Sequence, residues 1–382
     1  MEKHYTLLKA ADLLGVTTQT LRNWDNAGKI HTIRTVGNQR RIPESEIIRI
    51  SGGAVDNTAL TEQKPQRSIV EIQEKQVIPT ETVEIPAVIS KSEDNYLLMC
   101  RDIPVYDVTK SVILNDSLIP GCMQKSTMDF TEWMQTRFSS DTNYSSVRFM
   151  QETYKTYNHD KILFETRAVS LSDSYWLRKE KEDIKFNEIN LYNRFAPVAN
   201  LFLRGKTDKR WMDTQTLLKL NAFGEFEPYI LCSALRLDNI TQAQVSDEGM
   251  MLGNFTSSDL FYESVQQYGI AHEDPRDILI EKFKEQAVAL FVVDYLIENN
   301  DRHPDDYGFL RSSETGEYVS MAPYFNFDRA WSGESVALPE SAWRSHRSYI
   351  HELCRLAMDI AGDFEYGTII EKRANELLVK IK

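Results

Sequence analysis

Acidic and amide side chains are concentrated in two short segments in the last third of the chain. Residues 299–310 contain Asp301, His303 and Asp306, and residues 321–328 contain Asn326 and Asp328. Phosphoryl transfer needs a carboxylate that accepts a hydroxyl proton and oxygen ligands that hold Mg²⁺ on the nucleotide phosphates. Because the two segments supply both kinds of group, they predict a phosphotransfer site.

The sequence around these segments predicts the elements that position them. Residues 287–297 are almost wholly apolar, too few for a membrane span but suited to a buried helix that ends just before Asp301. Residues 307–310 and 318–321 flank a polar stretch and predict two strands joined by a turn. This hairpin would place Asn326 and Asp328 opposite Asp301.

A nucleotide site also needs a lysine on a strand and an acidic partner on a neighbouring helix. Lys219 lies between apolar residues in 217–220, and residues 225–235 predict a helix. The alternative is an edge strand from which Lys219 extends into water. No GxxxxGK[ST] sequence is present, which argues against a P-loop ATPase, and Lys209 is predicted to lie in a solvated turn.

The sequence Asp301-Arg302-His303, with Asp306 five positions after Asp301 and the run 322–328 further on, resembles the HipA-like serine/threonine kinase family. The resemblance covers residues 95–382 and implies an α+β, two-lobed kinase-like fold with a helical C-terminal lobe. It implies ATP and Mg²⁺ as cofactors, Asp301 as the catalytic base and His303 as a structural member of the catalytic loop.

The same resemblance assigns the other ligands. It implies that Lys219 holds the nucleotide phosphates and that Glu227 pairs with Lys219. It also implies that Asp306 binds the metal together with Asn326 or Asp328. The family usually has Asn where this chain has Asp306, and its second metal-binding Asp falls about where Asn326 stands, so the second ligand stays open between Asn326 and Asp328.

The first fifty residues predict a separate DNA-binding module. Apolar residues recur at helical spacing in 7–14 and 17–27, and the second of these segments carries a polar stripe, as in a helix-turn-helix whose second helix suits the major groove. Residues 33–42 predict a hairpin wing with basic side chains that grip phosphates. The candidate DNA-binding residues are Thr18, Gln19, Arg22, Asn23, Asn26, Arg34, Asn38, Arg40 and Arg41.

This module resembles the MerR-type and excisionase-like winged helix-turn-helix through residues 10–16, 21–24 and 37–42. The alternative is a small helical module for protein contacts. Charge favours DNA: residues 1–50 contain eight Lys or Arg against five Asp or Glu, whereas the whole chain has a net charge of -13. Double-stranded DNA, if bound, therefore meets residues 1–50.

Length and composition set the domain organisation. A chain of 382 residues with 42% hydrophobic residues predicts two or three folded domains. Residues 51–93 are rich in Thr, Glu and Gln without sustained periodicity and predict a flexible linker between a domain at 1–50 and a domain at 94–382. The lobes of the second domain are expected at about 94–240 and about 241–382, by the kinase resemblance.

The cysteines and the N-terminus indicate the cellular compartment. Four widely separated cysteines predict reduced thiols, and no signal peptide or membrane anchor is evident, so we expect a cytoplasmic protein.

Together these observations predict a DNA-binding protein kinase that moves the ATP γ-phosphate to Ser or Thr of a protein substrate, with the chain itself as one candidate. The HipA-like resemblance suggests a toxin-like or operon-regulating role, with an antitoxin-like partner and a homodimer as further candidates. The rival interpretation is a transcriptional or excisionase-like DNA-binding protein whose kinase fold is catalytically degenerate and serves sensing or dimerisation.

Overall fold

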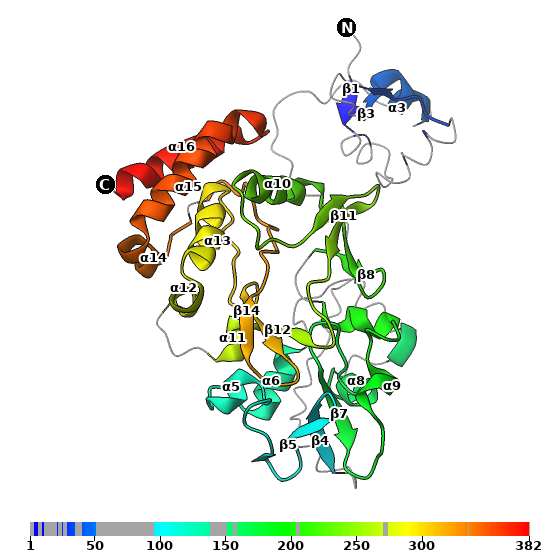
Figure 1. The fold of residues 1–382 in the computed structure, drawn as a ribbon. Helices are drawn as coiled ribbons and strands as arrows, with labels where there is room; N and C mark the ends of the chain where they lie inside the picture. The colour runs from blue at the N-terminus through cyan, green and yellow to red at the C-terminus, as the bar shows by residue number, and fades with distance from the viewer. Residues whose placement is uncertain are drawn as a thin grey trace, which may run out of the picture. The chain divides into compact units, whose positions relative to one another are not determined.

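The computed structural model describes residues 4–6, 10, 21, 25, 29–34, 40–50, 95–137, 150, 152–155, 159–203, 207–269, 274–334 and 336–381. The chain divides into two compact units, Met1–Val77 and Ile78–Lys382 (Figure 1). The predicted linker at 51–93 lies outside the described residues. The expectation of a multidomain chain with an α+β second part is confirmed.

The first unit contains a three-stranded antiparallel sheet in the order β1-β3-β2, followed by helix α3. The elements are β1 (His4–Thr6), β2 (Ile33–Arg34), β3 (Arg40–Pro43) and α3 (Glu44–Ile50). Ala10, Leu21, Ile30, Ile42 and Ile47 form its buried core. The predicted hairpin is confirmed, helix α3 follows it, and β1 adds a third strand that the sequence pattern did not indicate.

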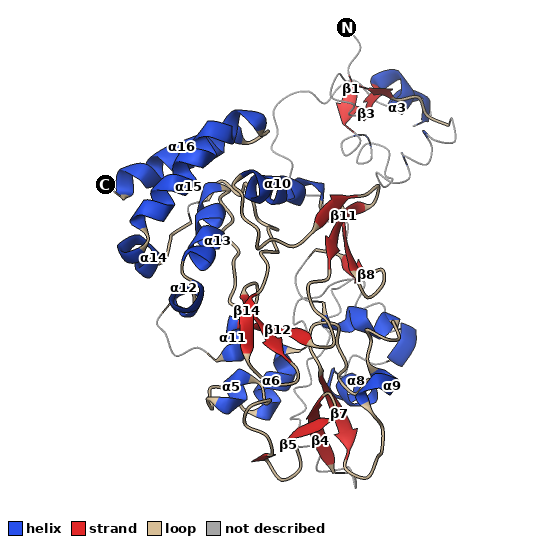
Figure 2. Ribbon diagram, in the orientation of Figure 1, coloured by secondary structure: helices blue, strands red, loops and turns tan. Residues whose placement is uncertain are grey.

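In the second unit, the described strands form three antiparallel sheets (Figure 2). The first has the order β6-β5-β4-β7, from β4 (Tyr96–Cys100), β5 (Ile103–Asp107), β6 (Val112–Ile113) and β7 (Tyr175–Lys179). The second has the order β10-β11-β9-β8, from β8 (Lys209–Trp211), β9 (Thr216–Leu220), β10 (Ala243–Val245) and β11 (Gly249–Gly253). The third has the order β12-β13-β14, from β12 (Leu260–Ser264), β13 (Gly308–Ser312) and β14 (Tyr318–Met321).

Short helices accompany the first sheet: α5 (Gly121–Gln124), α6 (Phe130–Thr136), α8 (His159–Glu165) and α9 (Phe186–Ile189). Helix α6 begins at a capping box, in which the Asp129 carboxylate accepts a hydrogen bond from the Glu132 backbone N–H at 2.8 Å. The Glu132 carboxylate accepts one in return from the Asp129 N–H at 2.9 Å. Two backbone donors that a helix start leaves unpaired are thereby satisfied.

Helix α10 (Phe226–Ala234) lies between β9 and β10, and the remaining described α-helices follow β12. They are α11 (Val265–Tyr268), α12 (Asp277–Phe283), α13 (Glu285–Leu296), α14 (Glu340–Ser345), α15 (Arg347–Ile360) and α16 (Gly367–Lys380). Helices α13, α15 and α16 pack against one another (Figure 1). None of the helices in the described ranges combines the length and apolar composition that crossing a membrane requires.

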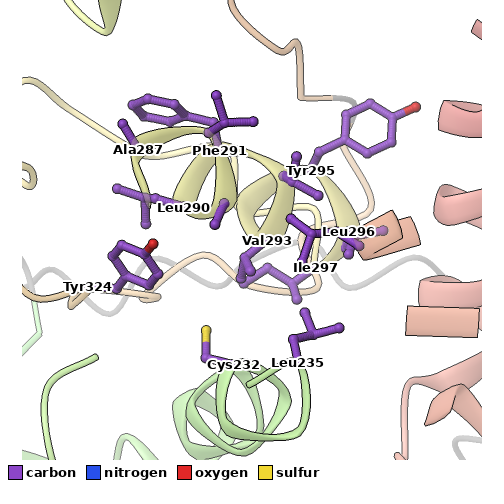
Figure 3. Close-up of a cluster of buried hydrophobic side chains, with 14 of the residues drawn as sticks. Cys232, Leu235, Ala287, Leu290, Phe291, Val293, Tyr295, Leu296, Ile297 and Tyr324 are labelled. Carbon is purple, nitrogen blue, oxygen red and sulfur yellow. The ribbon is translucent and has the colours of Figure 1, made fainter. Parts of the chain in front are cut away.

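Helix α13 is the buried helix that the apolar run predicted. Every residue from Ala287 to Leu296 is buried, including Asp294. Figure 3 shows Leu290 and Val293 of this helix in one hydrophobic cluster with Cys232 of α10 and with Leu235, which directly follows α10. Because this helix is fixed by packing on all sides, the loop that follows it starts from a rigid support.

Candidate phosphotransfer site

Lys219 is the buried centre of the site. Its side chain is 2% exposed, and β9 has hydrogen-bonded neighbours on both sides, so the alternative of an edge strand is wrong. The ε-amine donates hydrogen bonds to Glu225 Oε2 at 2.5 Å and to Asp328 Oδ1. A buried ammonium needs acceptor partners, and two carboxyl groups supply them here.

The acidic partner of Lys219 is Glu225 and not the expected Glu227. A short 3-10 turn, Phe223–Glu225, precedes α10 and turns Glu225 toward β9, whereas Glu227 lies in the first turn of the helix. The Glu227 carboxylate instead accepts a hydrogen bond from the Tyr366 backbone N–H at 3.3 Å. The difference of two residues arises because the turn, rather than the helix, faces the lysine.

The two carboxyl groups around Lys219 have opposite pKa shifts. Burial raises the pKa of Glu225 to about 7, although the Lys219 ammonium opposes this shift. At Asp328 burial acts in the same direction, but the ammonium groups of Lys219 and Lys209 outweigh it and lower the pKa to about 2. The cluster therefore favours an ionised Asp328 and a Glu225 that keeps its proton up to about pH 7, because burial outweighs the ammonium charge at Glu225 and is outweighed by it at Asp328.

Lys209 is a site residue that sequence reasoning placed in a solvated turn. It lies on β8 directly opposite Lys219 on β9, so the two side chains share one face of the sheet. Burial and the neighbouring Lys219 charge lower the pKa of Lys209, while Asp328 opposes the shift. Its strand, Lys209–Trp211, has only three residues, which is too short for a recognisable alternating pattern.

Asp306 and Asn326 join the two polar loops. The Asn326 side-chain amide donates a hydrogen bond to Asp306 Oδ1 at 2.9 Å, and the His303 backbone N–H donates to Asp306 Oδ2 at 3.0 Å. The Asn326 Oδ1 atom lies 3.4 Å from the Lys219 amine. Burial raises the pKa of Asp306, with Arg302 opposing the shift, so a bound cation would stabilise its ionised form.

Asn326 also has an unusual backbone conformation. Its φ of 62° lies in the left-handed region, which Asn adopts more readily than most residues. This conformation accompanies the two side-chain contacts of Asn326, one toward Asp306 and one toward Lys219.

The candidate base Asp301 is more exposed than the Lys219 cluster. Its side chain is 49% exposed, and its carboxylate lies 2.7 Å from His303 Nε2. Both residues belong to the loop that contains Asp306, which is closed by a hydrogen bond from the Asp306 N–H to the His303 carbonyl. A half-exposed carboxylate at the loop surface is accessible to an incoming hydroxyl group.

Arg302 holds the loop in place, and sequence reasoning gave it no role. Its guanidinium group donates two hydrogen bonds of 2.8 Å to the carboxylate of Asp294 in α13, and one of 2.5 Å to the Phe325 carbonyl. Arg302 thus connects the buried helix to both polar loops. The signal that could have found it is Asp294, an acidic residue within an otherwise apolar helix.

The structure therefore brings together Lys219, Asp306, Asn326 and Asp328 through direct contacts, with Asp301 and His303 in the same loop as Asp306. Among the described residues no group of three His, Cys, Asp or Glu side chains forms a metal site. Mg²⁺ in nucleotide sites usually takes one or two carboxylates and completes its shell with phosphates and water, so two carboxylates and an amide fit this ion.

The candidate DNA-binding residues fall mostly outside the described part of the chain, where Thr18, Gln19, Arg22, Asn23, Asn26 and Asn38 lie. Arg34 of β2 and Arg40 of β3 are direct register partners in the antiparallel sheet. Arg41 pairs with Thr6 of β1 and Ile33 of β2. The three arginines thus lie on the central strand and one outer strand of the small sheet.

Comparison with known proteins identifies the N-terminal segment. Residues 7–42 match the family model described as MerR family regulatory protein. The chain therefore carries a MerR-type helix-turn-helix DNA-binding region at its N-terminus, as the sequence predicted.

Two further comparisons concern the whole chain. No curated protein matches it. Among solved structures, it is similar to a chain from the complex of the Shewanella oneidensis MR-1 toxin–antitoxin system HipA, HipB and its operator DNA. The TM-score is 0.40 at 12% sequence identity, covering 75% of this chain and 96% of that chain.

Proposed function

We propose that the second unit binds ATP with Mg²⁺ and transfers the γ-phosphate to a Ser or Thr hydroxyl of a protein. The observation that supports this function best is the buried contact chain from Lys219 to Asp328, Asn326 and Asp306. It joins one amine, two carboxylates and one amide from a sheet and two loops. This set of groups matches what is needed to neutralise the phosphate charge of a nucleoside triphosphate and to position it.

Each residue has a distinct role in this proposal. Lys219 and Lys209, on one face of neighbouring strands, hold phosphate oxygens. Asp306, with Asn326 or Asp328, holds Mg²⁺. When bound, ATP would supply the phosphoryl group, and Mg²⁺ would neutralise the negative charge of the phosphates.

Asp301 accepts the proton of the substrate hydroxyl. The hydroxyl oxygen forms the new bond to γ-phosphorus, and the bond from γ-phosphorus to the β–γ bridging oxygen breaks, releasing ADP. His303, 2.7 Å from Asp301, fixes the orientation of the carboxylate.

The first unit is proposed to bind double-stranded DNA through the candidate residues of the helix-turn-helix and its wing. A DNA-binding region and a kinase site in one chain would allow the protein to act at its own operon. A toxin-like role in the cytoplasm and an antitoxin-like partner belong to the same proposal and rest on the HipA-like sequence resemblance.

The test is phosphate transfer from labelled ATP with Mg²⁺, measured as autophosphorylation and as labelling of proteins in a cell extract. Asp301→Ala should lower transfer by about a hundredfold or more, the usual contribution of a general base. Nucleotide binding should persist, because Asp301 makes no direct contact with Lys219 among those that the structure gives. ATP binding without transfer by the wild-type protein would favour the rival function, a DNA-binding regulator with a degenerate kinase site.

A further inference from the structure

A cavity lies beside the loop of Asp301, apart from the Lys219 cluster. Its volume is about 750 Å³, and its walls come from the start of α12, from Phe291 of α13, from residues 299–304 and from the segment before α14. Lys219, Glu225 and Asp328 do not line it. Its volume falls within the range of small-molecule binding sites, about 300–1,000 Å³.

The cavity has a negative balance of charge. Three aspartates and one glutamate line its walls, Asp274, Asp277, Asp294 and Glu340, against two guanidinium groups, those of Arg276 and Arg302. Both arginines are engaged by the protein itself. Arg302 binds Asp294 and the Phe325 carbonyl, and Arg276 binds Asp274 at 2.7 Å and the Ala337 carbonyl at 2.7 Å.

The other two carboxylates, Asp277 and Glu340, have weaker partners. Asp277 Oδ1 accepts a hydrogen bond from the neutral Ser341 hydroxyl at 2.6 Å, and its charged neighbour Arg276 is hydrogen bonded to Asp274. Glu340 pairs with Arg344, but both side chains are about three-quarters exposed (76% and 74%), and such surface pairs contribute little. The cavity therefore attracts a cation.

Asn300 provides independent evidence for a ligand, because its buried side-chain oxygen has no hydrogen-bond donor among the residues that the structure describes. Its Oδ1 atom is shielded from solvent and accepts no hydrogen bond within the described part of the chain. The side-chain orientation is fixed, because the Asn300 amide group donates to Glu334. Since Asn300 lines the cavity, a ligand with N–H groups would satisfy this buried acceptor.

The cavity also has an aromatic wall. The rings of Phe291 and Tyr307 meet edge to face with their centroids 5.6 Å apart, and both residues line the cavity. Aromatic surface suits the methylene stem of a lysine or arginine side chain, whose charged end can then reach Asp277 and Glu340.

We propose that this cavity binds a lysine or arginine side chain of the protein substrate, close in sequence to the Ser or Thr that accepts phosphate. The inference rests on the proposed kinase function. Asn300 and Arg302, the two neighbours of the candidate base Asp301 in the chain, both line the cavity. A basic residue within about five positions of the acceptor could reach it, since an extended chain advances about 3.3 Å per residue.

The experiment uses the full-length chain and fluorescent peptides with one central Ser, each carrying Arg, Lys, Ala or Glu at a scanned position from five before to five after it. Peptide binding is read by anisotropy, and phosphate transfer by labelled ATP with Mg²⁺. We expect at least one Arg or Lys peptide to bind about tenfold tighter than its Ala counterpart, the effect of two charge contacts of moderate strength. The double variant Asp277→Asn/Glu340→Gln should remove most of this preference, and Glu371→Gln, the same type of change on exposed α16, should retain it.

The two readouts separate the two proposals. Basic peptides that bind with the expected preference, without transfer to any peptide or protein, would support the cavity and overturn the kinase function. Phosphate transfer with no preference for basic peptides would support the kinase function and overturn the proposal that the cavity binds a basic side chain. The same holds if the double variant leaves the preference unchanged. A double variant that loses its folded circular dichroism spectrum is replaced by the single variant Asp277→Asn, for which about half of the preference should remain.

Discussion

Asp306 and Asn326 offer a cation one carboxylate and one amide oxygen. The HipA-like resemblance places Asn at the first of these positions and Asp at the second, the reverse of this chain. The two side chains are neighbours, hydrogen bonded at 2.9 Å. Exchanging them therefore leaves one carboxylate and one amide at the same place, with the same total charge. The exchange explains how two separate departures from the family pattern can leave the proposed Mg²⁺ site intact.

This exchange can be tested with paired substitutions. Asp306→Asn should lower phosphate transfer by about a hundredfold, the effect of removing one electrostatic interaction from a catalytic site. The double variant Asp306→Asn/Asn326→Asp should recover at least about tenfold of this decrease, because it restores one carboxylate and one amide. Rates measured over a Mg²⁺ titration check both results, and a double variant no better than the single one would contradict the interpretation.

Glu225 gives the nucleotide-free protein a specific pH dependence. Its folded-state pKa of about 7 lies above the ordinary value of 4.5, so the folded chain retains a proton that the unfolded chain releases between these values. Stability from this group is therefore full below pH 4.5 and falls as the pH rises toward 7. We expect Glu225→Gln, which resembles the protonated form, to unfold at nearly the same temperature as wild type at pH 5 and at a higher one at pH 8.

The comparison of the two melting curves isolates Glu225 from other titrating groups, which are common to both proteins. Asp328 titrates in a different window, since its pKa is about 2. A difference in melting temperature between wild type and Glu225→Gln that stays constant from pH 5 to pH 8 would show that Glu225 is not protonated in the folded protein.

At the scale of elements, Arg311 of β13 connects the third sheet to the segment before α5. Its guanidinium group, 1% exposed, donates hydrogen bonds to the carbonyls of Ser117 and Ile119 before α5 and to Glu263 of β12. Removing one partner of a buried pair leaves the other charge uncompensated, at a cost of about 3–5 kcal/mol. We expect Arg311→Met to lower the free energy of unfolding by about this amount, measured by urea denaturation.

The control is Arg210→Met. Arg210 pairs with Glu248, but the two side chains are 45% and 58% exposed, and such pairs contribute at most about 1 kcal/mol. Equal decreases in the free energy of unfolding for the two variants would mean that burial of the Arg311–Glu263 pair adds nothing to its contribution.

The elements of the site were largely predictable because they depend on local pattern. The apolar run gave α13, and the alternating segments gave β13 and β14 within one or two residues. The pairing of Lys219 with Glu225 was not predictable, because it depends on a 3-10 turn whose geometry no periodicity reveals. Lys209 was missed for a related reason: its burial depends on the pairing of β8 with β9, not on its own three-residue strand.

At the scale of the whole molecule, charge is divided between the two ends of the chain. The net charge is -13, yet residues 1–50 have eight basic and five acidic residues, a balance of +3 that leaves -16 for the remainder. A polyanion such as DNA is repelled by most of the chain and attracted by this segment alone. DNA affinity should therefore depend strongly on a few arginines and on salt.

Arg41 is the candidate for which the structure describes the side chain, and it follows Arg40 on β3 directly before the buried Ile42. For the full-length chain on duplex DNA, removing one side chain that neutralises a phosphate should reduce the slope of log K against log salt by about 0.9. We expect Arg41→Ala to reduce the slope by this amount and to weaken binding to all duplex sequences similarly, because a wing arginine contacts phosphate rather than bases. Anisotropy titrations at several salt concentrations measure this slope; a variant that loses affinity for one sequence only would instead place Arg41 at a base edge.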